Sequence, residues 1–227
     1  MKIEQSSFLD SIDSVFGFLS ENWDMFISKN RDEYKKFLEI MVNACDSTIY
    51  LAGLGGSYQI LKLFKTKLES PMIGYGNVNI FWSEPIGPPS GRNDVLVVLS
   101  GSLTSHVVKK IEIFFDYETY QSLNVVVITA TKESKIFENS DVRFYLPVID
   151  QELLKQSRGK TYKEVQINNL QWALEEDKEM PWRNLRMHPY TVFHILSSFI
   201  LESITLDMII EFQRNKLRRR VEKWTDH

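Results

Sequence analysis

The segment that most constrains the fold is the apolar run from Val95 to Leu99, which ends in Ser100-Gly101-Ser102. No polar residue interrupts the run, a pattern typical of a strand buried on both faces in the middle of a parallel sheet. Helical spacing follows over residues 107–120. A strand that leads through hydroxyl groups and a glycine into a helix favours phosphate binding, because the helix N-terminus presents free N–H groups and the positive end of its dipole. The alternative, that one hydroxyl merely caps the helix, stays open.

A second turn of this kind follows the first predicted strand, Ile49 to Ala52. That strand runs into Gly53-Leu54-Gly55-Gly56-Ser57, and residues 58–68 then resume helical spacing. Glycines at such a turn let the backbone approach a phosphate closely. A dinucleotide-binding fold would want a further glycine where Tyr58 stands, with Glu84 as its ribose-binding acid, so we keep that fold only as an alternative.

The rest of the chain alternates between strands and helices. Further strands are predicted at Val78–Phe81, Asn124–Thr129 and Val142–Leu146. Helices are predicted at 7–28, from Asn30 to about Cys45, and from Thr191 to about Lys223. Strands that alternate with helices predict βαβ units with right-handed crossovers. We therefore expect an α/β fold: a three-layer α-β-α sandwich with a five-stranded parallel sheet, two N-terminal helices and a long C-terminal helix.

Composition narrows the class of protein. The 227 residues are 43% hydrophobic, enough for one sizeable core, and the net charge of −3 does not suggest nucleic-acid binding. A single cysteine, Cys45, excludes an internal disulfide and fits a reducing cytoplasm. Glu202 and Asp207 interrupt the apolar C-terminal segment, which argues against a membrane span. No metal-ligand spacing is found. We expect a cytoplasmic protein with no metal, nucleic-acid or membrane partner.

The motifs resemble those of the sugar isomerase (SIS) domain, most closely in the 6-phospho-3-hexuloisomerases. Residues 53–57 match G-x-G-R-S in part, as residues 100–105 match S-G-S-G-E-T and residues 191–194 match T-L-F-E in part. The likeness covers roughly residues 8–148 and 190–212 with the elements in the same order.

The resemblance implies one SIS domain over residues 1–227. Its parts are the N-terminal helices 1–46, a sheet core 47–148, a charged insertion 149–190 and the C-terminal helix 191–223. It also implies a flavodoxin-like sheet, no cofactor, and a homodimer or homotetramer with sites near the subunit interfaces. The residues implied to hold the phosphate of a sugar-phosphate ligand are Gly55, Ser57, Ser100, Gly101, Ser102, Thr104 and Ser105.

Three departures from the hexuloisomerase motifs matter for catalysis. Gly56 stands in place of arginine, Leu103-Thr104 in place of glycine-glutamate, and His194 in place of the final glutamate, the family's base for moving a proton through an enediol. Histidine suits that task, since its unperturbed pKa of about 6.5 keeps it largely neutral in the cytoplasm. His194 packing on an apolar helix is an equally open interpretation, and Glu84 is a second candidate base.

Two functional hypotheses remain. The first is a cofactor-free aldose–ketose sugar-phosphate isomerase with His194 or Glu84 as the base. The second is a non-catalytic phosphosugar-binding or regulatory protein that kept the phosphate site and lost the glutamate. The insertion 149–190, with Trp172 and Trp182, could be a lid, an oligomer arm or a surface excursion.

Overall fold

The computed structural model describes residues 17, 20, 28–44, 46–80, 93–103, 111, 123–146 and 189–225, with side chains in the last range from 192 to 215. The predictions of a helix at 7–28, of helical spacing over 107–120 and of an insertion at 149–190 lie almost entirely outside the described residues. The single domain over residues 1–227 therefore stays a prediction.

The sheet has five parallel strands in the order β2-β1-β3-β4-β5. Each predicted strand is present, with its end shifted by at most one residue. All six residues of β3 are buried, as its uninterrupted apolar run predicts. The strands are β1 (Ile49–Gly53), β2 (Val78–Ile80), β3 (Val95–Ser100), β4 (Asn124–Thr129) and β5 (Val142–Tyr145).

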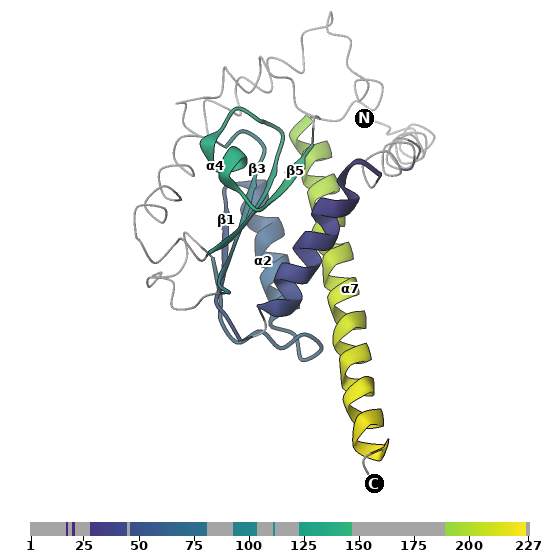
Figure 1. The fold of residues 1–227 in the computed structure, drawn as a ribbon. Helices are drawn as coiled ribbons and strands as arrows, with labels where there is room; N and C mark the ends of the chain where they lie inside the picture. The colour runs from purple at the N-terminus through teal and green to yellow at the C-terminus, as the bar shows by residue number, and fades with distance from the viewer. Residues whose placement is uncertain are drawn as a thin grey trace, which may run out of the picture.

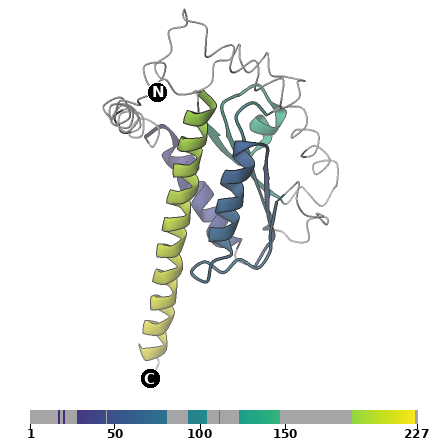
Figure 2. The ribbon, with the colours of Figure 1, turned by 180° about the vertical axis from the view of Figure 1, so that it is seen from behind.

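Helices cover both faces of the sheet. The helix over residues 28–43, α2 (Gly56–Leu68) and α7 (Pro189–Thr225) lie on one face (Figure 1, Figure 2). The other face packs against Ile111, which is helical, and against the short helix α4 (Lys135–Asn139). Alternate residues of β3 point into the two clusters, because successive side chains of a strand face opposite sides. The result is the predicted three-layer sandwich.

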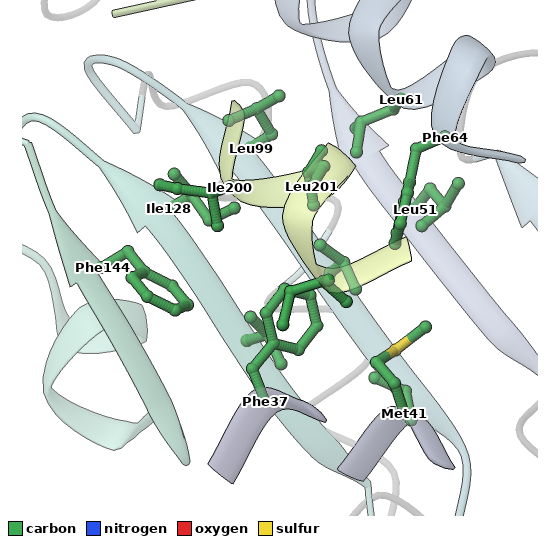
Figure 3. Close-up of a cluster of buried hydrophobic side chains, with 14 of the residues drawn as sticks. Phe37, Met41, Leu51, Leu61, Phe64, Leu99, Ile128, Phe144, Ile200 and Leu201 are labelled. Carbon is green, nitrogen blue, oxygen red and sulfur yellow. The ribbon is translucent and has the colours of Figure 1, made fainter. Parts of the chain in front are cut away.

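The first half of α7 is part of the core. Figure 3 shows Ile200 and Leu201 of α7 lying over the sheet, among Phe37 and Met41 of the 28–43 helix and Leu61 of α2. All five side chains are essentially inaccessible to solvent, so their apolar surface is stabilised by burial against the strands.

This packing explains why α7 is so apolar. The segment Val192–Asn215 is long and apolar enough to cross a membrane by length and composition, with a mean hydropathy of 1.6. Two of its three acidic residues tie it to the rest of the fold. Glu202 forms an ion pair with Lys67 of α2, and Asp207 accepts a hydrogen bond of 2.7 Å from the hydroxyl of Tyr34. α7 is therefore built as a core helix that packs on a sheet.

Candidate functional site

The two serine-glycine turns meet at one edge of the sheet. β1 and β3 are neighbours, and the chain leaves them toward opposite sides, β2 lying beyond β1 and β4 beyond β3. Gly53, the last residue of β1, is in register with Leu99 of β3, so the two turns begin side by side. The carboxyl ends of strands at such a reversal of order are where open α/β sheets bind ligands.

The first turn depends on its glycines for different reasons. A Cβ on Gly53 would lie 2.9 Å from the backbone oxygen of Leu99, so only glycine lets β1 and β3 approach this closely. Gly55 has φ 55° and ψ −125°, a conformation that side chains other than hydrogen avoid. Because the N-cap residue of α2 is Gly55, no side chain caps the N-terminus of this helix with a hydrogen bond. Ser57, which is 3% exposed, lies in the first helical turn.

The second turn folds back on the strand that precedes it. The Ser100 hydroxyl oxygen accepts a hydrogen bond of 3.0 Å from the backbone N–H of Leu103. The backbone oxygen of Gly101 accepts from the N–H of Ala130 at 3.1 Å. Ser100 and Ser102 are both buried. The Ser100 proton remains available to donate to a ligand, because the bond from Leu103 uses an oxygen lone pair.

Leu103 has an unusual backbone conformation in this turn. Its φ is 47°, in the left-handed region that favours glycine, and the hexuloisomerase motif has glycine at this position. The side chain is 6% exposed and packs into the apolar cluster on the α4 face. The turn therefore keeps a glycine-like shape while carrying a core side chain.

His194 extends from α7 over the first turn. Its Nε2 atom lies 3.4 Å from the Ser57 hydroxyl oxygen, and its ring meets that of Phe193 edge-on at 5.7 Å between centroids. A Cβ built on Gly56 would lie 2.3 Å from Cε1 of the imidazole. Gly56 and His194 are thus in direct contact. Sequence reasoning identified both as departures but missed their contact, because 138 positions separate them and no local pattern links them.

The structure brings part of the predicted site together. The described members are Gly55, Ser57, Ser100, Gly101, Ser102 and His194, all on elements that meet at this edge. Thr104, Ser105 and the second candidate base Glu84 lie outside the described residues. Across the described part of the chain, no three His, Cys, Asp or Glu side chains gather as a metal site would require. Hydroxyls, N–H groups and an imidazole together suit a phosphorylated ligand.

Comparison of the chain with known proteins gives matches at the level of structure. No protein-family model and no curated protein matches the sequence. A hypothetical protein aligns over 89% of this chain and 90% of its own, with TM-score 0.58 and 19% identity. A putative sugar-phosphate isomerase from Listeria monocytogenes aligns over 93% and 94%, with TM-score 0.53 and 13% identity.

The Vibrio vulnificus NanR protein, in a complex with ManNAc-6P, aligns over 96% of this chain and 69% of its own, with TM-score 0.54 and 15% identity. The fold is that of the SIS domain. The fold class predicted from the strand pattern is confirmed, and the resemblance predicted from the turn motifs is confirmed at the level of the fold. The closer likeness to the hexuloisomerases stays a prediction. At these identities the agreement concerns the SIS fold and does not extend to a reaction.

Proposed function

We propose that this chain binds a sugar phosphate at the carboxyl ends of β1 and β3 and interconverts its aldose and ketose forms without a cofactor. The observation that carries the proposal is the 3.4 Å approach of His194 Nε2 to the Ser57 hydroxyl, where a base meets the phosphate turn. The names of two structural neighbours support the ligand class: one is called a sugar-phosphate isomerase, and the other holds ManNAc-6P.

The two turns would share the phosphate. The first turn of α2 has no side-chain cap. The N–H of Ser57 donates to the backbone oxygen of Leu54 at 3.1 Å, so the helix dipole and the N–H groups of Gly56 and Tyr58 would face an anion. Ser57 and Ser100 add hydroxyl donors from neighbouring elements, and Ser102 follows Ser100 in the second turn. Among the described residues of the two turns, the groups that would stabilise a phosphate are dipoles and hydrogen-bond donors.

His194 would carry the proton transfer. In the isomerisation a base takes a proton from the carbon beside the carbonyl, an enediol forms, and the proton returns to the former carbonyl carbon. A proton also passes from the hydroxyl group of the first carbon to the former carbonyl oxygen, so one carbon is oxidised while its neighbour is reduced and no external oxidant or reductant is consumed. Ser57 would orient the ring, because a hydroxyl 3.4 Å from Nε2 limits its rotation. Glu84 is the second candidate base.

The alternative is a non-catalytic phosphosugar-binding or regulatory protein. The contact of the His194 ring with Gly56 favours this alternative, because it holds the imidazole against the turn that contains Ser57. In that position the imidazole could contact a bound phosphosugar without acting as a base. The two functions share Ser57 and Ser100 and differ in whether a carbon-bound proton exchanges with solvent.

A thermal-shift screen followed by isotope exchange tests the proposal. Hexose, hexulose, heptose and amino-sugar phosphates are compared with their unphosphorylated sugars. A ligand at a hundred times its Kd stabilises the native state by about 2.7 kcal/mol, or about 5–10 °C for a chain of this size. Ser57→Ala should reduce the shift. If no phosphosugar raises the Tm above its free sugar, the phosphate site is wrong.

The isotope experiment separates the isomerase from the binding protein. The phosphosugar that binds is incubated with the protein in D₂O, and deuterium at C1 and C2 is followed by NMR. We expect incorporation with the wild type and loss of it with His194→Gln, while Glu84→Gln tests the second base. Binding without any deuterium incorporation would leave the non-catalytic function.

We also propose that the protein forms homodimers or homotetramers through α7. Phe199, Leu206 and Ile210 are 41–53% exposed and recur at helical spacing, so they form one apolar stripe. Sedimentation should give a mass above that of the monomer, and Leu206→Glu should lower it toward the monomer. A wild type that sediments as a monomer would contradict the assembly. The cytoplasmic location stays a prediction from the single cysteine.

A further inference from the structure

The imidazole of His194 occupies the space where a side chain at position 56 would begin. A Cβ built on Gly56 would lie 2.3 Å from Cε1, 2.7 Å from Nδ1 and 2.9 Å from Nε2 of the ring. Real Cβ atoms essentially never approach another heavy atom within 3.0 Å. The ring in its present position and any side chain at residue 56 therefore exclude each other.

The backbone of Gly56 does not by itself require glycine. Gly56 is the first residue of α2, and the left-handed conformations among the described glycines belong to Gly55 and Gly74. Gly53, by contrast, is constrained by a backbone oxygen of the neighbouring strand. Within a helix glycine is a poorer choice than alanine. The three heavy atoms nearest to the missing Cβ of Gly56 all belong to His194, so the contact with that ring is the reason for this glycine.

We infer that Gly56 is a positioning residue for His194, and that the two act as one specificity element of the ligand site. The inference rests on the proposed function, in which the turn that contains Ser57 holds a sugar phosphate. Without a Cβ at residue 56, the imidazole reaches over the first turn of α2 and brings Nε2 to 3.4 Å from the Ser57 hydroxyl.

The same pair accounts for two of the sequence departures together. Positions 56 and 194 are where the hexuloisomerase motifs have arginine and glutamate, and here they hold glycine and histidine. The contact couples the two changes, because the imidazole at position 194 fits in its present position only if residue 56 is glycine. A ligand at this point meets an imidazole nitrogen, and neither position offers it a guanidinium or a carboxylate group.

A double-mutant cycle with Gly56→Ala and His194→Ala tests the contact without a ligand. In the wild type Gly56→Ala should lower the Tm, since the ring must rotate away from Ser57. In the His194→Ala background the same change should raise the Tm, because the three heavy atoms nearest to the new Cβ are gone and alanine is the better helix residue. If Gly56→Ala changes the Tm by the same amount in both backgrounds, the inference is wrong.

Gly76→Ala is the matched control for this cycle. A Cβ on Gly76 meets nothing within 4 Å, so its effect should be the same with and without His194. Should Gly56→Ala alone fail to fold, recovery of the folded protein in the Gly56→Ala/His194→Ala double variant tests the same contact. Failure of the double variant to recover, with His194→Ala itself folded, would overturn the inference.

The functional part is tested with inorganic phosphate as the probe. The Cε1 proton signal of His194, assigned by its absence in His194→Ala, is followed by NMR as phosphate is added. We expect a saturable shift in the wild type and a shift at least several-fold smaller in Gly56→Ala. Equal shifts in the two proteins would overturn the positioning role. No response in the wild type, together with a Tm effect that still reverses sign, would instead refute the phosphate site of the proposed function.

Discussion

Leu103 combines two opposing contributions to stability in the second serine-glycine turn. Its backbone is left-handed at φ 47°, which costs a residue with a Cβ about 1–2 kcal/mol. Its side chain is 6% exposed and packs in the same cluster as Leu123, which lies just before β4 and is 7% exposed. Among the described residues other than glycine, Leu103 alone has a positive φ, so Leu123 is a control of the same type without the strain.

We predict that alanine and glycine substitutions rank differently at these two leucines. Truncation of either side chain to alanine should destabilise the protein by about 2–4 kcal/mol. At Leu123 glycine should be worse than alanine by about 1 kcal/mol, since it gains freedom in the unfolded chain. At Leu103 glycine also relieves the backbone strain. Relative to Leu123, the free energy of unfolding of the glycine variant should therefore rise by about 1–2 kcal/mol against that of the alanine variant.

Urea unfolding of the four variants measures this difference directly, provided that the m-values agree. In thermal unfolding the same 1–2 kcal/mol corresponds to about 2–8 °C for a chain of this length. Comparing glycine with alanine at each position cancels most of the free energy lost with the leucine side chain. The remaining difference between the two positions measures the backbone strain at Leu103. If glycine is worse than alanine by the same amount at Leu103 and at Leu123, the left-handed turn does not store strain and the reasoning fails.

Two further predictions concern contacts outside the site residues. Gly53→Ala should lower stability by about 1–3 kcal/mol, because its Cβ would lie 2.9 Å from the backbone oxygen of Leu99, which cannot move aside; an unchanged Tm would contradict this. Tyr34→Phe should destabilise by about 1 kcal/mol, since it removes the 2.7 Å hydrogen bond to Asp207 that joins the 28–43 helix to α7. Burial and that hydrogen bond raise the pKa of Tyr34 above its ordinary value of 10.0, so the folded state holds the proton more tightly than the unfolded state. This stabilisation is complete below pH 10 and declines above it, and Tyr34→Phe should flatten the decline; identical alkaline stability curves would refute it.

Local pattern determined most of the sheet. Uninterrupted apolar runs identified the buried strands β3 and β4, and alternation with helical spacing predicted that the sheet is parallel. Both serine-glycine turns were found because they follow predicted strands directly, so their place at the carboxyl edge is a consequence of chain direction. These features depend on residues close together in the chain, which is why the sequence sufficed.

The contacts between distant segments were decided only by the tertiary structure. Neither the proximity of His194 to Gly56 nor the pairing of Glu202 with Lys67 has a local signal, because each joins α7 to α2 across more than half of the chain. The left-handed backbone of Leu103 likewise contradicts its residue type and persists where its buried side chain and the bond from its N–H to Ser100 hold it. Sequence pattern thus determined the elements and the edge at which a ligand would bind. Packing between elements decided which side chain stands over that edge, because the space available to His194 depends on the approach of two helices and not on any single stretch of sequence.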